Sequence, residues 1–282
     1  MGNSLSRKKR HKRPYIYFLA PSIITMFIVI ILPFLYSIVI TFFDVNLLEN
    51  GGKWVFAGLK NFKTFLKDER VWNSIFVTLK FVFSSLFIQF VLGTSLALFF
   101  DRKFKGRRII RSLLIMPMFM TPVVVGVIWR AFYDPINGLI NYYLMNMGII
   151  KDYISWLGNI NTSLPAVLIA EAWRSTAFMF LLPMASLDSV SGEIYESALV
   201  EGANELQIIR FIKIPILIPT FFVAIVLRLV DLMKAFDLFY TMTKGGPGTS
   251  TETINMYAYL LISKMFIHRL SIQVSYVSTA YE

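Results

Sequence analysis

The sequence has no cysteine and few charged residues. The lack of cysteine excludes disulfide bonds and thiolate chemistry, although it does not identify a cellular compartment. Charged residues make up only 16% of the 282 residues, whereas a soluble domain of this size carries about a quarter. Apolar residues reach 56%, and 26 of the residues are Phe. This composition predicts an all-α polytopic membrane protein.

Signatures of nucleotide binding and catalysis are also missing. The motif G-x-x-x-x-G-K-[ST] does not occur, and the glycine cluster at 245–248 lacks the lysine and the helix that would follow it in a phosphate cradle. The two histidines, His11 and His268, lie in unrelated segments, which argues against a histidine metal site. The sequence therefore predicts no catalytic residue, no metal site and no cofactor bound by this chain. The net charge of +11 would suit nucleic acid, but the basic residues cluster beside apolar runs, so no such partner is expected.

Five apolar runs are long enough to cross a bilayer. They are predicted at residues 15–43, 71–100, 109–132, 164–187 and 214–240. The first run is too long for a signal peptide, and no small-residue cleavage site follows a short apolar core. Five spans place the two termini on opposite sides of the membrane.

Lysine and arginine are distributed unequally between the two sides. The side of the amino terminus has fourteen of them, in 1–13, 101–111 and 188–213. The other side has nine, in 44–70, in 133–163 and after residue 241. Because basic residues favour the cytoplasmic side, this difference predicts a cytoplasmic amino terminus. The predicted organisation is a basic cytoplasmic N-terminus at 1–13 and a transmembrane domain at 14–282 with a cytoplasmic loop at 188–215.

One stretch of that loop, YESALVEGANEL at 195–206, is acidic and amphipathic. Treated as a helix over 193–206, it has an apolar face with the small residues Ala198 and Gly202 at its centre. Small residues there let a partner's backbone approach closely. Alternatively, Gly202 ends the first helix, since glycine is the favoured residue at that position. A helix lying on lipid headgroups usually presents Lys and Arg rather than glutamate, so the pattern favours docking to a protein.

The same stretch resembles a known motif. Glu196-Ser197-Ala198-Leu199-Val200-Glu201-Gly202, nine further residues and Ile212-Lys213-Ile214-Pro215 are similar to the EAA loop of ABC importer permeases. That pattern is E-A-A, three residues, G, nine residues, I-x-L-P, and here Ser197 stands for alanine and Ile214 for leucine. In that family the loop is the coupling helix, which seats in a cleft of the cytoplasmic ATPase subunit. The resemblance assigns ATPase docking to Tyr195, Glu196, Ala198, Leu199, Glu201, Gly202, Ala203 and Leu206.

Other stretches resemble the carbohydrate branch of that family, the maltose and glycerol-phosphate permeases. They are Gly106-Arg107-Arg108 through Pro117, Val127 to Arg130, and Phe236-Asp237 followed by Thr241 to Gly248. The resemblance covers about residues 14–266 and implies the type I ABC importer permease fold in a bacterial inner membrane, with a sugar as substrate. The implied partners are a second homologous permease, two ABC ATPase subunits that carry ATP and Mg, an extracytoplasmic solute-binding protein and the lipid bilayer.

The resemblance fails at the carboxyl end. Family members close with a further span, whereas the residues after Phe266, IHRLSIQVSYVSTAYE, are too few and too polar to cross a bilayer. A truncated, frameshifted or incompletely represented end is therefore expected.

Ionisable residues also lie inside the apolar runs. The pairs Glu171/Arg174, Arg228/Asp231 and Lys234/Asp237 are each spaced i, i+3, so each can pair on one helical face. One interpretation is that such charges fix helix packing or reach the membrane surface, which fits Lys80 and Arg130 best. The other is a polar path for a sugar, because buried charges usually face a bundle interior or a wet cavity. The residues predicted for that path are Glu171, Trp173, Arg174, Phe178, Arg228 and Asp231.

Two other functional classes remain as alternatives. An ion-coupled secondary transporter would use intramembrane carboxylates, but it should carry an internal repeat with broken helices, and the sequence shows no convincing one. A membrane-embedded enzyme would need catalytic groups that converge at one membrane surface.

Overall fold

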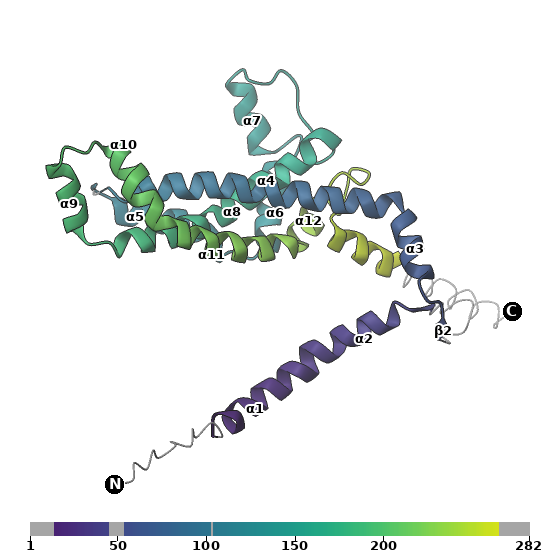
Figure 1. The fold of residues 1–282 in the computed structure, drawn as a ribbon. Helices are drawn as coiled ribbons and strands as arrows, with labels where there is room; N and C mark the ends of the chain where they lie inside the picture. Colours follow the sequence, from purple (N-terminus) through teal and green to yellow (C-terminus); the bar gives the residue numbers. More distant parts are fainter. Residues whose placement is uncertain (1–13, 45–53, 103, 265–282) are drawn as a thin grey trace, which may run out of the picture. The chain divides into compact units, whose positions relative to one another are not determined.

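The computed structural model describes residues 14–44, 54–102 and 104–264 (Figure 1). The basic segment 1–13 and the polar end after residue 264 lie outside the described residues. Contacts divide the chain into two compact units, Met1–Asp68 and Glu69–Glu282. Most described residues are helical, as the composition predicts.

The first unit contains one candidate span and a short amphipathic helix. Helix α1 (Pro14–Met26), the π-helical turn η1 (Phe27–Ile31) and α2 (Leu32–Ile40) form a continuous run, of which Phe18–Ile40 is apolar enough to cross a membrane. Strands β1 (Phe43–Asp44) and β2 (Val55–Phe56) then pair antiparallel and lead to α3 (Lys60–Lys67). The amide Nδ2 of Asn61 donates to the carbonyls of Thr41 and Phe43, at 3.0 and 2.9 Å, and so ties α3 to the end of the span.

The second unit is built around three long helices. Helix α8 (Ile160–Asp188) lies against both α4 (Glu69–Phe100) and α11 (Ile214–Met233). Helix α8 is the most buried of the three: 61% of its apolar stretch is buried, against 33% for α4 and 28% for the stretch that contains α11. It is therefore the central helix. At the α4–α8 contact, a Cβ added to Gly93 would lie 2.5 Å from the Cβ of Met179, so only glycine permits this approach.

The third predicted span, 109–132, is not a straight helix. Helix α5 (Arg107–Ile115) and the 3₁₀ turn η2 (Met116–Phe119) precede α6 (Pro122–Phe132), and the two parts meet at 103°. Met120 and Thr121 are both extended. For Thr121 the reason is local, because the residue before a proline disfavours the helical conformation and Pro122 has no N–H to continue a helix. The predicted third span is thus a bent pair of helices, and when the pair is counted as one span the described residues contain five candidate spans, the predicted number.

The fifth predicted span, 214–240, extends too far at its carboxyl end. Helix α11 ends at Met233, and α12 (Asp237–Met242) begins after a break. The side-chain amide of Asn255 donates to the carbonyl of Met233 at 2.9 Å, so a distant residue satisfies the end of α11. In the other direction the helix starts earlier than predicted, because α10 (Glu205–Ile208) and η3 (Ile209–Lys213) lead into α11 and the apolar helical stretch runs over Glu205–Met233.

The end of the bundle where α4 begins is held by buried polar contacts. The Arg70 guanidinium forms two hydrogen bonds to the buried Glu252 carboxylate, at 2.8 and 2.6 Å. The Thr78 hydroxyl accepts from the backbone N–H of Ile254 at 2.9 Å. Residues 254–264 are again helical. Helix α7 (Leu139–Asn146) is held by Asn141, whose Oδ1 accepts from the Trp156 indole at 2.8 Å.

Candidate functional site

The two polar links 101–111 and 188–215 meet at one end of the bundle. Lys213 pairs with Asp101, and Arg102 pairs with Glu205. Asp188, at the end of α8, accepts an ion pair from Arg107 at 3.2 Å. The alternation of spans predicts that both links lie on the same side, and these three contacts place them together.

The acidic stretch forms two short helices instead of the single helix predicted over 193–206. Helix α9 (Gly192–Val200) is capped by Ser191, whose Oγ accepts from the Glu193 N–H at 3.3 Å. It is terminated by Gly202, which has a φ of +82°, a conformation that favours glycine. Of the two predicted roles for Gly202, the structure has the helix-ending one. The helical wheel therefore applies only as far as Val200.

A capping box starts the second of these helices. Asn204 Oδ1 accepts from the Gln207 N–H at 2.9 Å, and Gln207 Oε1 accepts from the Asn204 N–H at 2.7 Å. Leu206 is therefore on α10, not on the face of α9 where the single-helix prediction had placed it.

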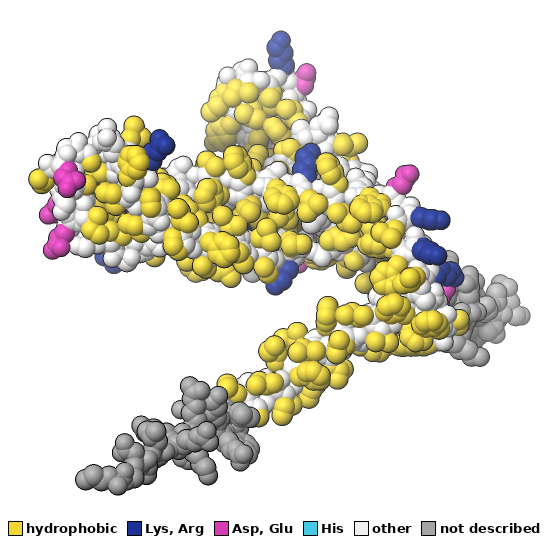
Figure 2. Space-filling view, viewed as in Figure 1, with side chains coloured by type: hydrophobic (Ala, Val, Ile, Leu, Met, Phe, Trp, Pro, Cys, Tyr) yellow, Lys and Arg dark blue, Asp and Glu magenta, His cyan; other side chains and the backbone are white. Residues whose placement is uncertain are grey.

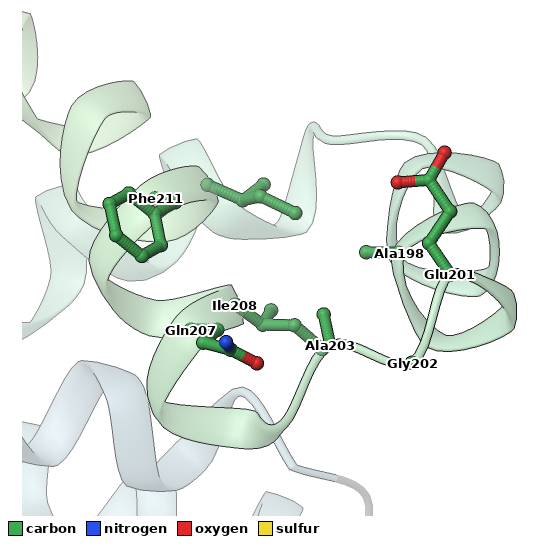
Figure 3. Close-up of a pocket in the computed structure, with 8 residues that line it drawn as sticks. Ala198, Glu201, Gly202, Ala203, Gln207, Ile208 and Phe211 are labelled. Carbon is green, nitrogen blue, oxygen red and sulfur yellow. The ribbon is translucent and has the colours of Figure 1, made fainter.

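An open groove lies between the two short helices (Figure 3). Its volume is about 320 Å³, and it is lined by Ala198, Glu201, Gly202, Ala203, Gln207, Ile208, Phe211 and Ile212. Four of the predicted docking residues thus border one concave surface. The other apolar ones, Leu199 and Leu206, are 58% and 77% exposed. Glu196 is exposed too, and acidic side chains gather at the end of the bundle formed by α9 (Figure 2).

Tyr195 differs from the other predicted docking residues because it points inward. The Lys213 ammonium lies 5.3 Å from the centre of its ring, and its hydroxyl is buried without a hydrogen-bond partner among the described residues. Burial, and then the negative charge of Asp101, raise the pKa of the Tyr195 hydroxyl. Tyr195 therefore attaches α9 to the bundle, whereas the groove and the exposed side chains around it are open to solvent in this chain.

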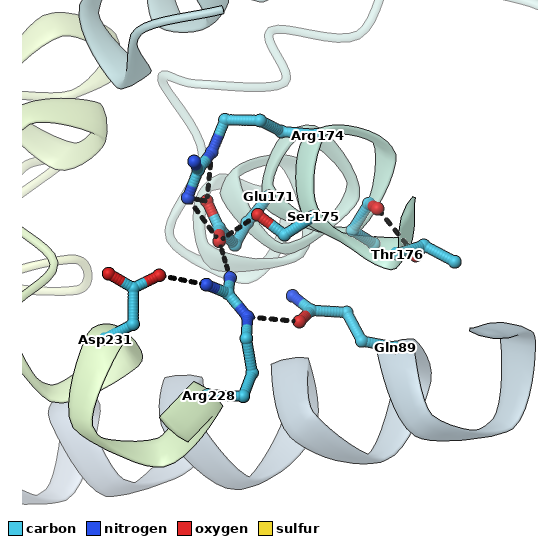
Figure 4. Close-up of polar contacts among 8 residues, drawn as sticks. Gln89, Glu171, Arg174, Ser175, Thr176, Arg228 and Asp231 are labelled. Atoms are coloured by element: carbon cyan, nitrogen blue, oxygen red, sulfur yellow. Dashed lines mark hydrogen bonds and ion pairs between the residues drawn. The ribbon is translucent and has the colours of Figure 1, made fainter. Parts of the chain in front are cut away.

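A second group of predicted residues comes together within the bundle (Figure 4). Arg228 of α11 is its centre, with a side chain only 4% exposed. Its guanidinium pairs with Glu171 of α8 and with Asp231, and its Nε donates to Gln89 Oε1 of α4 at 2.6 Å. Arg174 adds a further ion pair to Glu171 at 2.9 Å. We call these five residues the buried charge network.

The charges in this network cancel, but its two carboxylates differ in their exposure to solvent. Two arginines face two carboxylates, so the network carries no net charge. The Glu171 side chain is 4% exposed, whereas the Asp231 side chain is 61% exposed. Ser175 Oγ donates a further hydrogen bond to Glu171, at 2.9 Å, so this carboxylate accepts from three side chains. Asp231 is therefore the member whose carboxylate remains accessible.

The two aromatic residues predicted for the path lie outside the network. Trp173 packs its ring 5.9 Å from that of Trp129 on α6. Phe178 is half-buried on α8. Gln89 was missed in the sequence, and the signal that could have found it is a glutamine within the apolar run 71–100.

The remaining intramembrane charges are not in this cluster. The prediction that Lys234 and Asp237 share a helical face was wrong, because α11 ends at Met233 and α12 begins at Asp237. Lys80 and Arg130 are exposed, in agreement with the interpretation that places them away from the core. Among the described residues, no group of three or more His, Asp or Glu side chains is close enough to hold a metal ion.

Comparison with known proteins identifies the family. Residues 89–279 match the family described as the binding-protein-dependent transport system inner membrane component. The chain is 32% identical over 262 residues to the trehalose/maltose transport system permease protein MalF of Thermococcus litoralis, which covers 92% of this chain and 87% of that protein. It is 31% identical over 205 residues to the sn-glycerol-3-phosphate transport system permease protein UgpA of Agrobacterium fabrum, covering 72% of this chain and 69% of that one.

A solved structure supports the same conclusion. A bacterial ABC transporter involved in import of the acidic polysaccharide alginate contains a chain that superposes with a TM-score of 0.74 at 26% sequence identity, covering 88% of this chain and 83% of that one. The chain therefore belongs to the family of inner-membrane components of binding-protein-dependent transport systems, and within it to the ABC permeases that resemble sugar transporters.

Proposed function

We propose that this chain is the permease subunit of an ATP-driven importer that carries a sugar or oligosaccharide into the cytoplasm. Two separate ABC ATPase subunits bind ATP and Mg and hydrolyse the ATP, and a second homologous permease completes the membrane pathway. An extracytoplasmic solute-binding protein delivers the substrate. This chain contributes the path and the docking loop, and it performs no chemistry.

The observation that carries this proposal is the exposed groove between α9 and α10. A contiguous patch of exposed apolar side chains rimmed by polar ones marks an interaction site, and Leu199, Val200 and Leu206 are exposed here beside glutamates. The glutamates disfavour anionic lipid headgroups, and the small residues Ala198, Gly202 and Ala203 leave room for a partner's backbone. A cytoplasmic ATPase subunit that receives the loop in a cleft fits these features.

The loop is attached to the spans at several points, which provides a route for movement. It follows α8 directly, it continues into α11, and the pairs Lys213–Asp101 and Arg102–Glu205 link it to the end of α4. A displacement of α9 by the ATPase subunits would therefore reach all three long helices. In the proposed mechanism, closure of the ATPase dimer moves the loop and converts the bundle from inward-open to outward-open.

The substrate class follows from the relatives and from the buried charge network. The similar permeases are named for trehalose, maltose and glycerol-3-phosphate transport. Of these, trehalose and maltose are neutral polyhydroxyl solutes, which suit a network without net charge, and the accessible Asp231 carboxylate can accept hydrogen bonds from their hydroxyl groups. We propose Asp231 as the part of the predicted path that contacts sugar, with Glu171, Arg174 and Arg228 holding it in place.

The proposed orientation has the amino terminus and the 188–215 loop in the cytoplasm. The excess of basic residues on that side supports it. A cysteine-accessibility experiment on intact cells tests it directly, since a cysteine introduced at Ser197 should react with a membrane-impermeant reagent only after the cells are opened.

The docking function is tested by replacing Gly202 with tryptophan. The bulky side chain, together with the loss of a residue that tolerates a φ of +82°, should prevent the loop from seating. We expect the ATPase subunits to co-purify with the wild-type chain and to be lost from Gly202→Trp. The matched control is Gly148→Trp, because Gly148 also has a positive φ of +69° and open space around it but lies in the link on the opposite side.

Two outcomes would contradict the proposal. Retention of ATPase subunits by Gly202→Trp at the wild-type level would contradict the assignment of the loop as the ATPase-docking site. Sugar uptake by this chain alone, in vesicles without ATP, would instead favour the ion-coupled transporter.

A further inference from the structure

Helix α5 has an apolar side that no described residue covers. Leu114 and Ile115 pack inward against the cluster that contains Phe100 and Phe180. On the outer side, Ile109 and Leu113 are 69% and 63% exposed. The helix is therefore amphipathic, with one apolar side in the bundle and a second one open.

Basic side chains flank this open apolar side. Arg107 and Arg111 share one carboxylate, that of Asp188, at 3.2 and 3.5 Å. Lys105 and Arg108 are exposed, and among the described residues no carboxylate pairs with either of them. Among the described residues of this segment, four cationic side chains thus have one carboxylate partner between them, which leaves a local surplus of positive charge.

The surplus charge and the apolar surface meet at an open pocket. Its volume is about 710 Å³, and it is lined by Phe104, Gly106, Arg107, Arg108, Ile109 and Arg111. Guanidinium groups bind phosphate oxygens with directional hydrogen bonds, and Phe104 and Ile109 provide apolar contact beside them. The pocket therefore offers one part to an anionic group and an adjacent part to a hydrocarbon chain.

We propose that α5 and this pocket bind an anionic phospholipid of the surrounding membrane. An exposed apolar side next to unpaired cations, at the end of membrane-crossing helices, is the pattern of a helix at the lipid interface. Clusters of Lys and Arg beside a span attract anionic headgroups. The adjacent α9 has the opposite charge and exposes glutamates, so the two neighbouring surfaces select different partners.

The proposal is tested on the assembled transporter reconstituted in nanodiscs of equal parts phosphatidylglycerol and phosphatidylethanolamine. The complex is released into mild detergent, and the retained lipids are counted by native mass spectrometry. We expect the wild type to retain phosphatidylglycerol selectively. The double variant Lys105→Ala/Arg108→Ala should lose that selectivity by about 25-fold, because each cation next to a membrane contributes about fivefold to anionic-lipid binding.

Two variants serve as controls. Lys105→Arg/Arg108→Lys keeps the charges and should retain phosphatidylglycerol. Lys63→Ala/Lys151→Ala removes two exposed lysines from other segments and should behave like wild type. Unchanged retention by Lys105→Ala/Arg108→Ala would overturn the proposal. So would loss of another subunit from that variant with phosphatidylglycerol still bound, because the open side would then be a protein interface.

Discussion

The buried charge network and the acidic loop use the same residue types in opposite ways. In the network, Arg228 and Glu171 are almost completely buried, and their charged groups are paired with one another and with neighbouring helices. In the loop, Glu196 and Glu201 are exposed, and among the described residues neither forms an ion pair. The comparison indicates that carboxylates hold helices together in the first region, whereas in the second they are available to a partner.

The energetic consequences of the two arrangements differ. Removing one member of a buried pair leaves an uncompensated charge in an apolar environment and costs about 3–5 kcal/mol. Removing an exposed charge changes stability by less than about 1 kcal/mol. Substitutions of the buried members of the network, such as Arg228 and Glu171, should therefore act on folding, and substitutions in the loop should act on assembly.

The largest effect is expected for Arg228→Ala. This change leaves the buried Glu171 with only Arg174 as an ionic partner and removes the donor to Gln89. The unfolding free energy should fall by about 3–5 kcal/mol, measured by thermal unfolding of the purified complex in detergent. The control Lys234→Ala, which removes an exposed charge directly after the end of α11, should melt like wild type. Equal melting temperatures of the two variants would contradict the claim that the buried charges contribute more to stability than exposed ones.

The comparison can be sharpened within the network itself. Glu171→Gln should lower the melting temperature markedly, because it weakens ion pairs to both arginines. Asp231→Asn should melt close to wild type, because its side chain is 61% exposed, but it should reduce sugar uptake and substrate-stimulated ATPase activity. If neither substitution affects transport, the predicted path through these residues is wrong.

An intermediate effect is expected from the capping box of α10. Asn204→Ala removes the acceptor for the Gln207 N–H and should destabilise the start of α10 by about 1 kcal/mol. Hydrogen exchange of the amides in 204–208 should become faster, with the exchange of α8 unchanged. Asn204→Asp, which keeps the acceptor, should retain slow exchange, and equally fast exchange in both variants would exclude the cap as the cause.

The smallest effect concerns Tyr195 and alkaline pH. Because burial raises the pKa of its hydroxyl, the contribution of neutral Tyr195 is fully present below its ordinary value of 10.0 and is lost as the pH rises through the folded-state value. Limited proteolysis between pH 8 and pH 11 should show the 188–215 loop of the wild type becoming more susceptible than that of Tyr195→Phe. A parallel increase in both proteins would assign the change to other groups, such as lysines.

The sequence predicted the elements that depend on local patterns. Apolar runs revealed the spans, and the i, i+3 spacing correctly paired Glu171 with Arg174 and Arg228 with Asp231. Gly202 indicated the end of the first helix of the loop. That this loop docks an ATPase subunit stays a prediction. These features could be read because each depends on residues within a few turns of one another.

Features that depend on distant residues could not be predicted in this way. The contacts of Arg228 with Glu171 and Gln89 join residues 57 and 139 positions apart. The end of α11 at Met233 has no glycine or proline to mark it, and its last turn is satisfied by Asn255 from beyond α12. The break before Pro122 was signalled by a proline, but the length of the apolar run hid it. Tertiary contacts, which a single sequence does not show, decided these positions.

The contact at Gly93 has a mechanical consequence. Where this residue meets Met179, there is no room for even a Cβ on Gly93, so α4 and α8 are in close contact at this point. We therefore expect α4 and α8 to move together as one rigid body when the loop is displaced. Relative motion during a transport cycle would then fall to α11 and the bent α5–α6 pair. Cross-linking α4 to α8 should leave uptake intact, whereas cross-linking α11 to α8 should stop it.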